Sequence, residues 1–310
     1  MNMKYTLRQI EAFVAIARSD NVSRAAEALN LSQSATSAAL AELENQFEHQ
    51  LFDRHGRRLH LNEQGRLLLP RAVELLDRAE EVEALLRGER GLGSLRVGAT
   101  LTIGNYLLPL IVSGFLQRHP ESHVQLQVQN TANVVAQVLH HEIDLGLIEG
   151  QVLDREIEIE PWVDDELVVF CAPSHRLAQQ STATLAEIAA EPMILRERGS
   201  GTRETFEQAL RHWEGGLRVQ LELEHTEAIK RAVESGLGIG CISRLALRDA
   251  FRRGSLVPVE TPELDLRRRF QFIWRRGKYH TAAIRTFLDD CRALTSGAQR
   301  SHEISLPAVP

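Results

Sequence analysis

The sequence predicts an α/β protein with a helical N-terminal head, a long connecting helix and a larger region of alternating strands and helices. Three observations support this prediction. Short amphipathic helices fill residues 1–50, a seven-residue apolar repeat runs through 63–87, and strand-like and helix-like segments alternate from residue 93 onward. A chain of 310 residues is long enough for two or three domains, each with its own core.

The composition is that of a soluble globular protein, with 43% hydrophobic and 25% charged residues. Three widely spaced cysteines without a C-x-x-C pair predict neither a zinc site nor a disulfide framework, and they fit a reducing cytoplasm. The longest apolar run, near 107–116, is too short to cross a bilayer, and we expect neither a membrane segment nor an export signal. Because the net charge is -6, a DNA-binding surface must depend on local placement of charge.

The first 61 residues are predicted to form a DNA-binding domain that begins with three helices. The first helix is expected to begin after the capping residue Thr6, and the second to span about 22–29. Ser32 is a good cap for a third helix to about residue 45. The residues of the third helix expected to face inward are Ala35, Ala39, Leu40 and Leu43.

The exposed N-terminal end of the third helix carries uncharged amide and hydroxyl side chains. Such groups reach base edges and phosphates in the DNA major groove, although an ordinary solvated helix end would have the same composition. Residues 51–61 are predicted to form two short strands around a glycine turn with arginines at the tip, a wing for phosphate or minor-groove contact. The predicted DNA contacts are Gln33, Ser34, Thr36, Ser37, Arg54, Arg57 and Arg58.

Residues 62–92 are predicted to form a dimerisation helix followed by a hinge. Apolar residues recur at alternating spacings of four and three, and charged residues fill the other faces, which indicates a two-stranded coiled coil. Pro70 is expected to kink the helix or delay its start. Gly88, Gly91 and Gly93 mark the hinge. The predicted seam consists of Leu68, Ala72, Leu75, Ala79, Val82 and Leu86.

The region from residue 93 to 296 is predicted to bind a small effector in an α/β fold. Candidate strands are 95–99, 124–128, 143–148, 167–172, 193–195, 219–223 and 238–242, with helices between most of them, which predicts largely parallel sheets. Ligands of such sheets collect at the carboxyl ends of strands, where hydroxyls, glycine amides and helix N-termini cradle small anions. The predicted effector-binding residues are Thr100, Thr102, Asn130, Thr131, Glu149, Arg198, Gly199, Ser200, Gly201, Thr202 and Thr226.

Glu149 is the one carboxylate in this set. A carboxylate repels an anionic effector unless it is protonated or paired, and Arg198 is the expected partner. An amino acid or another zwitterion therefore stays open beside a small anion.

The N-terminal motifs resemble those of LysR-type transcription regulators. The resemblance rests on Ala25-Ala26, Ser32-Gln33-Ser34-Ala35, Leu51-Phe52-Asp53-Arg54 and Leu61-Asn62-Glu63-Gln64-Gly65. It implies a winged helix-turn-helix, promoter DNA as a partner, a homodimer or homotetramer, and allosteric control by an effector. The subgroup that it resembles includes sulfur-metabolism and carbon-fixation regulators, which implies an oxyanion such as sulfate or sulfite, with phosphorylated metabolites as an alternative.

The same resemblance implies that the effector region is similar in fold to a periplasmic binding protein with two lobes. Lobe I would span about 93–164 and 269–296, and lobe II about 165–268. The tail, 297–310, is predicted to be disordered.

Two other classes of protein are weighed against a regulator. No nucleotide-binding, hydrolase or metalloprotease motif occurs in a suitable context, and the glycine-rich run at 236–240 precedes a strand rather than following one, so we expect no enzyme and no cofactor. His140 and His141 are adjacent and the other histidines are scattered, so we expect no metal site. A free solute-binding protein would carry an export signal and would lack the winged helix.

Overall fold

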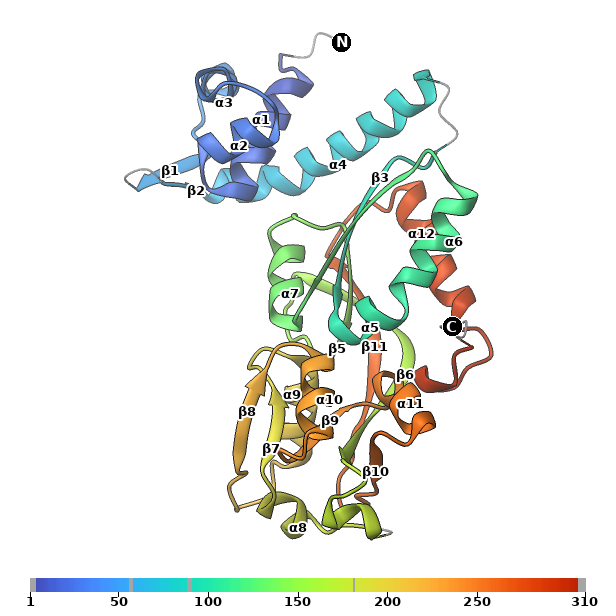
Figure 1. Ribbon diagram of the computed structural model, residues 1–310. Coiled ribbons are helices and arrows are strands. Elements are labelled where there is room, and N and C mark those ends of the chain that lie inside the picture. Colours follow the sequence, from blue (N-terminus) through green and yellow to red (C-terminus); the bar gives the residue numbers. More distant parts are fainter. Residues whose placement is uncertain (1–3, 56–57, 88–90, 181, 306–310) are drawn as a thin grey trace.

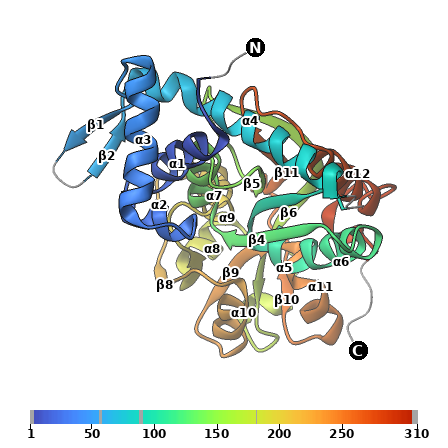
Figure 2. The ribbon, with the colours of Figure 1, turned by 90° about the horizontal axis from the view of Figure 1, so that it is seen from above.

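The computed structural model describes residues 4–55, 58–87, 91–180 and 182–305. Figure 1 shows a small helical head beside the long helix α4 (Glu63–Arg87). Lobe I of the effector region lies next to α4, and lobe II lies beyond lobe I. Seen from above, the wing of the head projects away from the effector region (Figure 2). No helix among the described residues is long and apolar enough to span a membrane.

The head contains α1 (Leu7–Ser19), α2 (Val22–Ala28), α3 (Gln33–Phe47), β1 (Phe52–His55) and β2 (Arg58–Leu61). The predicted caps are confirmed: Thr6 forms a capping box with Gln9, and the Ser32 hydroxyl accepts a hydrogen bond from the amide of Ala35. β1 and β2 pair antiparallel to form the wing. The apolar faces of α1 and α3 meet around Phe13, which is fully buried, so the head has its own core.

Helix α4 packs its first half against the head. It begins at Glu63 with Pro70 inside it, so the expected delay by the proline does not occur. Ala72 is buried in the core of the head, while Leu68 and Leu75 pack at the edge of that core. Ala72 therefore cannot lie on a partner helix, and the predicted seam is wrong at this position.

The second half of α4 leaves its apolar side chains exposed. Val82 and Leu86, two members of the predicted seam, are exposed, as is Leu85. These side chains are exposed because only the first half of the helix runs alongside the core of the head. Dimerisation through the remaining seam residues stays a prediction.

One sheet runs through both lobes in the order β4-β3-β5-β11-β6-β9-β7-β8, with β10 added to β6. In lobe I, β3 is parallel to both β4 and β5; in lobe II, β7 is parallel to both β8 and β9. The bounds of these strands are β3 Ser94–Thr100, β4 His123–Gln129, β5 Leu145–Glu149, β7 Met193–Arg196, β8 Val219–Leu223, β9 Ile239–Ser243 and β10 Val257–Val259.

Two long antiparallel strands, β6 (Ile157–Cys171) and β11 (Arg267–Arg275), join the lobes. The first part of β6 pairs with β11, and its last part, from Leu167, pairs with β9 of lobe II. β11 in turn pairs with β5 of lobe I. The chain thus crosses between lobes within these two strands, and the lobe bounds given above stay predictions. β11 was not among the strands predicted from the sequence.

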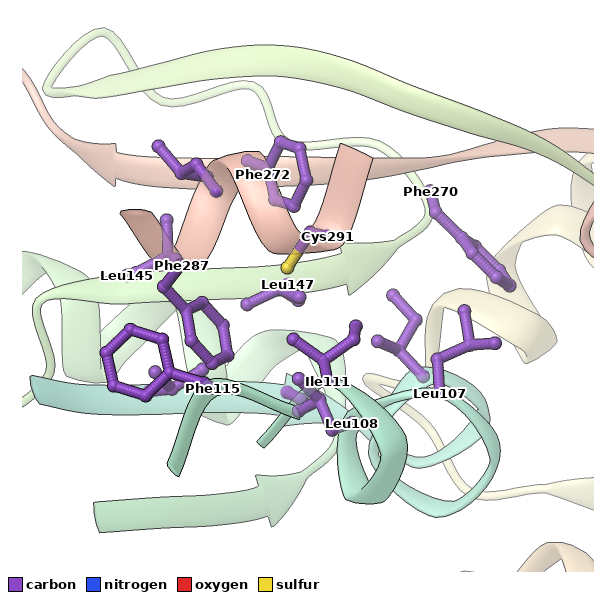
Figure 3. Packing of buried hydrophobic residues seen from close by; sticks show 14 of the residues in the cluster. Leu107, Leu108, Ile111, Phe115, Leu145, Leu147, Phe270, Phe272, Phe287 and Cys291 are labelled. Atoms are coloured by element: carbon purple, nitrogen blue, oxygen red, sulfur yellow. The ribbon is translucent and has the colours of Figure 1, made fainter. Parts of the chain in front are cut away.

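Helices cover the sheet of each lobe. Lobe I carries α5 (Leu101–Tyr106), α6 (Leu108–Arg118), α7 (Thr131–Leu139) and α12 (Ala282–Leu294). Lobe II carries η1 (Arg176–Gln179), α8 (Leu185–Ala190), α9 (Gly201–Ala209), α10 (Thr226–Glu234) and α11 (Arg244–Arg253). Figure 3 shows the main core of lobe I, where Phe115 of α6 meets Phe287 of α12 edge-on at 5.6 Å between ring centroids. Each lobe has a core of its own, and Leu245 of α11 packs into the core of lobe I.

The end of the chain is folded as far as the structure describes it. Residues Ser301–Glu303 form the short helix η2, and Ile304 is buried in the core of lobe I. The hydroxyl of the buried Ser301 donates a hydrogen bond to Asp165 of β6. The prediction of a disordered tail from residue 297 is therefore wrong up to residue 305; residues 306–310 lie outside the described residues.

Candidate functional site

The predicted effector residues converge on Glu149, at the carboxyl end of β5. Its Oε1 accepts hydrogen bonds from the hydroxyl of Thr102 at 2.9 Å and from that of Thr202 at 3.4 Å. Thr102 belongs to lobe I and Thr202 to lobe II. Glu149 is 1% exposed and each threonine 2%. A buried carboxylate therefore joins the two lobes where they meet.

Backbone contacts close the cleft beside this carboxylate. Thr131 donates from its hydroxyl to the carbonyl of Glu149 at 2.9 Å and accepts from the amide of Gly201 at 3.1 Å. The amide of Ala132 donates to the carbonyl of Gly199 at 3.1 Å. Gly201 allows this approach because a Cβ there would lie 1.9 Å from the carbonyl oxygen of Glu149. The two lobes are thus in direct backbone contact beside Glu149.

Two helices begin at this point from opposite lobes. α7 starts at Thr131, where Asn130 caps it by accepting from the amide of Asn133, and α9 starts at Gly201 without a side-chain cap from Ser200. Helix N-termini carry partial positive charge, which stabilises a carboxylate or a bound anion. Glu149 lies beside both of them.

Arg268 of β11 is the partner of Glu149 and was missed by the sequence analysis. Its Nη1 donates to the Thr202 hydroxyl at 2.9 Å, its Nη2 lies 3.4 Å from Glu149 Oε2, and its Nε donates to Asp165 at 2.6 Å. Burial alone would lower the pKa of Arg268, but Glu149 and Asp165 outweigh this effect and raise it. Arg198, the expected partner, is exposed, so that pairing is wrong.

The alternation of apolar and polar residues along β11 could have identified Arg268 as a side chain on the buried face of the strand. Arg268, Phe270 and Phe272 alternate with more exposed residues, and all three are buried. The adjacent Arg267 and Arg269, both exposed, hide this alternation because three arginines in a row look like a solvated segment.

Two other predicted residues, Thr100 and Thr226, are buried but do not bond to the carboxylate. Thr100 is buried, and its hydroxyl donates to the carbonyl of Leu147 at 3.5 Å. Thr226 begins α10 and is buried, but no hydrogen bond within the described chain joins it to Glu149. Next to it, Glu227 accepts from the hydroxyl of Tyr106 at 2.7 Å, a second bridge between the lobes.

The candidate DNA-binding surface is the exposed N-terminal end of α3. Gln33, Ser34 and Ser37 are exposed as predicted. Thr36 is completely buried and its hydroxyl donates to the carbonyl of Ser32, so it cannot contact DNA. Ala35, expected inside, is exposed instead. Thr36 is buried in place of Ala35 because a rotation of about 100° per residue puts Thr36 on the same helix face as Leu40 and Leu43.

Two of the three predicted wing arginines lie on its described strands. Arg54 and Arg58 lie on the paired strands β1 and β2, for which the structure describes the backbone at these positions. Arg57 lies outside the described residues. Contact of these arginines with DNA stays a prediction.

A charged junction connects the head to lobe I. Lys278 Nζ contacts Asp77 of α4 at 2.6 Å and Asp144, just before β5, at 2.9 Å, and all three side chains are at most 15% exposed. Arg96 of β3 also contacts Asp144, at 2.7 Å. Although burial alone would raise it, the pKa of Asp144 is held well below its usual range by Lys278 and Arg96. The position of the head is thus tied to lobe I by ion pairs.

His141 lies at the same junction and should make stability sensitive to acid. Burial, together with Arg275 and other cations, lowers the pKa of His141 to about 3. Since an unfolded histidine titrates near 6.5, the stability contributed by the neutral ring is complete above that pH and is lost as the pH falls toward 3. We expect a loss of about 2 kcal/mol on going from pH 7 to pH 5.

The variant His141→Asn tests this expectation. Asparagine tolerates the left-handed backbone of this position, where φ is 57°, and does not titrate. Urea unfolding at pH 7 and pH 5 should show a smaller difference for the variant than for the wild type, while His140→Asn, at an exposed site, should leave the difference unchanged. If the free energy of unfolding changes equally between pH 7 and pH 5 in the wild type and in His141→Asn, the role assigned to His141 is wrong.

A winged helical head joined through a long helix to a two-lobed domain with buried polar contacts between the lobes defines the class of DNA-binding regulators that carry an effector domain. Residues 7–66 match the family of bacterial regulatory helix-turn-helix proteins of the lysR type, and residues 88–296 match the LysR substrate binding domain. The chain belongs to the LysR family of transcription regulators. The expectation of a regulator rather than an enzyme is confirmed.

Relatives place the chain more closely within this family. It is 45% identical over 289 residues to YeiE of Escherichia coli K12, described as an uncharacterized HTH-type transcriptional regulator, covering 93% of this chain and 98% of that protein. It is 33% identical to the RuBisCO operon transcriptional regulator of Allochromatium vinosum, covering 97% and 99%. The predicted likeness to carbon-fixation regulators is thereby confirmed.

A solved structure similar to the effector region is that of the CcmR regulatory domain of Synechocystis in complex with 2-PG. It is 30% identical in sequence, with a TM-score of 0.62, and the match covers 66% of this chain and 99% of that one. Within the described part of the chain, no group of three or more metal-ligating side chains could hold a metal ion.

Proposed function

We propose that this regulator binds a small oxyanion in the cleft around Glu149 and that closure of the lobes on it alters binding to promoter DNA. The observation that carries the proposal is the meeting of two helix N-termini from opposite lobes at buried hydroxyls and the Arg268 guanidinium. Groups of this kind bind sulfite, sulfate or phosphate. An anion held there contacts both lobes and so stabilises their closed arrangement.

Thermal unfolding of the full-length protein tests the ligand and its site. A ligand at a hundred times its dissociation constant adds about 2.7 kcal/mol of stability, so sulfite, sulfate, phosphate, 2-PG and amino acids are compared as single additions. The variant Thr202→Val should lose the stabilisation, and Thr182→Val, at an exposed threonine, should keep it. Stabilisation that survives in Thr202→Val would place the ligand elsewhere.

A phosphorylated metabolite is the second candidate effector. It is favoured by the structure of the Synechocystis CcmR regulatory domain, which was determined in complex with 2-PG. Stabilisation by 2-PG without stabilisation by inorganic oxyanions would select this candidate.

The DNA-binding role is assigned to Gln33, Ser34 and Ser37 of α3 and to the wing. Replacing Gln33 with alanine should weaken binding to the specific promoter site by about 1–3 kcal/mol if its amide contacts a base, with little effect on nonspecific DNA. Fluorescence anisotropy with specific and random duplexes measures both affinities. Gln50→Ala, at an exposed glutamine before the wing, serves as the control; equal loss on both duplexes would mean that Gln33 carries no sequence information.

Coupling between cleft and head is assigned to the junction at Lys278. Lobe I carries Asp144 and Lys278, and α4 carries Asp77, so movement of lobe I is transmitted to the head. Allosteric coupling is usually about 1–3 kcal/mol, or about 5–150-fold in affinity. In Lys278→Met the effect of the effector on DNA affinity should fall toward onefold, while effector binding persists. Arg276→Met, an exposed change in the same segment, should preserve the coupling.

The protein is proposed to act in the cytoplasm as a homodimer or homotetramer. The exposed Val82, Leu85 and Leu86 of α4 supply an apolar surface for a second copy of the helix, and two heads would match a two-fold related DNA site. Access to DNA and the three buried free cysteines fit a reducing compartment.

A further inference from the structure

The C-terminal segment, residues 297–305, lies beyond the matched family domain and is folded against it. The match to the LysR substrate binding domain covers residues 88–296. Beyond it, Ser301 and Ile304 are 0% and 1% exposed, and Ile304 belongs to the core of lobe I. The carbonyl of Ile304 also accepts a hydrogen bond from Arg248 of α11 at 2.8 Å. The segment is therefore anchored both to lobe I and to α11.

The hydroxyl of Ser301 donates to Asp165, a carboxylate that is 2% exposed. Asp165 Oδ1 accepts a second hydrogen bond from the hydroxyl of Ser243 in β9, at 2.7 Å, and Oδ2 accepts from Arg268 Nε at 2.6 Å. Three donors thus fix one carboxylate, and the C-terminal segment supplies one of them. A buried carboxylate depends strongly on such donors because water does not replace a lost one.

Arg268 carries this constraint from the crossing strands to the contact between the lobes. While Asp165 holds its Nε, its Nη1 donates to the Thr202 hydroxyl at 2.9 Å and its Nη2 lies 3.4 Å from Glu149 Oε2. The guanidinium is planar and rigid, so the orientation of Nε determines where both Nη atoms lie. Within the described chain no hydrogen bond joins Ser301 to Thr202 directly, so the connection between them runs through the carboxylate and the guanidinium.

We propose that Ser301 is a positioning residue: through Asp165 it orients Arg268, and so holds α9 of lobe II against lobe I. The other role open to the segment is only to cover the apolar surface around Ile304. The two roles differ in where a change in the segment is felt. Positioning predicts an effect at the contact between the lobes, whereas covering predicts an effect only in α11 and β6, against which the segment packs. The inference goes beyond the proposed function and does not depend on which effector binds.

Hydrogen–deuterium exchange of the full-length protein, measured by mass spectrometry, tests the positioning role. Two amides report on the contact between the lobes. The amide of Gly201 donates to the Thr131 hydroxyl at 3.1 Å. The amide of Ala132 donates to the carbonyl of Gly199 at 3.1 Å. In Ser301→Ala, which removes only the hydroxyl, we expect exchange of both amides to become about three- to tenfold faster, because one hydrogen bond to a charged group is lost at a distance.

Two comparisons separate the Ser301 hydroxyl from general effects on the segment. Ser305→Ala removes an exposed serine from the same segment and should leave the exchange of both amides at the wild-type rate. In Thr202→Val the contact of Arg268 with α9 is already broken. Adding Ser301→Ala to that variant should therefore change exchange of the Ala132 amide by less than about twofold.

Each outcome supports or overturns the positioning role. Faster exchange at the contact between the lobes in Ser301→Ala, absent from Ser305→Ala and from the Thr202→Val background, supports it. Faster exchange only in α11 and β6 would mean that the segment acts as a cover, and would overturn it. Unchanged exchange in Ser301→Ala, or equal acceleration in Ser305→Ala, would also overturn it. Full acceleration in the Thr202→Val background would show that the segment acts by a route other than Arg268, which contradicts the proposal.

Discussion

Replacing Arg268 with methionine is expected to lower the free energy of unfolding of the effector region by about 3–5 kcal/mol. The guanidinium lies between Glu149 and Asp165, and methionine fills similar volume without a charge. Both carboxylates would then remain buried without a cation among the groups that contact them. Urea unfolding of the full-length protein, followed by near-ultraviolet circular dichroism of the tryptophans, measures the change.

Two comparisons isolate the role of the charge. Arg267→Met removes the neighbouring arginine, whose side chain is 73% exposed, and should change stability by less than about 0.5 kcal/mol. The triple variant Arg268→Met, Glu149→Gln and Asp165→Asn should recover part of the loss because it leaves no unpaired charge. A loss below about 1 kcal/mol for Arg268→Met alone would show that the cluster is not held by its ion pairs.

Replacing Gly201 with alanine is expected to prevent closure of the lobes. The added Cβ would lie 1.9 Å from the carbonyl oxygen of Glu149 and 2.8 Å from the Thr131 hydroxyl, both in lobe I. Loss of the contacts made by Gly201 and Thr202 should weaken effector binding by about 100-fold, or about 2.7 kcal/mol. Calorimetry measures the affinity, and small-angle scattering measures the opening of the lobes.

Gly216→Ala is the matched control for this prediction. No atom lies within 4 Å of a Cβ at Gly216, so the same addition is accommodated in lobe II without contact with lobe I. Effector affinity and scattering of this variant should equal those of the wild type. Unchanged effector affinity in Gly201→Ala would mean that the effector does not bind by the closure seen here.

Local signals allowed much of the head and the cleft to be predicted. Thr6 and Ser32 identify helix starts because their side chains satisfy free amides, and this interaction lies within three residues. Hydroxyls and glycines after β3, β4 and β7, together with Glu149 at the end of β5, identify the site for a similar reason, since strand ends in parallel sheets meet at one edge. The convergence of Thr102, Thr131 and Thr202 on Glu149 follows from this rule.

Pairings between distant segments could not be predicted in the same way. Arg268 reaches Glu149 across more than a hundred residues of sequence, and nothing local to either residue favours it over Arg198. Thr36 and Ala35 are a different case, because their faces follow from the helical period relative to Leu40 and Leu43 and could have been assigned from the sequence. The tail was misassigned because its order depends on contacts of Ser301 and Ile304 with lobe I and its crossing strand.

The central claim, that an effector in the cleft controls the head, is tested most directly by titrating a promoter duplex with the full-length protein with and without sulfite, in wild type and in Thr202→Val. We predict that sulfite changes the affinity for DNA by about 5–150-fold in the wild type and has no effect in the variant, which should still bind DNA. An equal response of both proteins to sulfite would contradict control through this cleft.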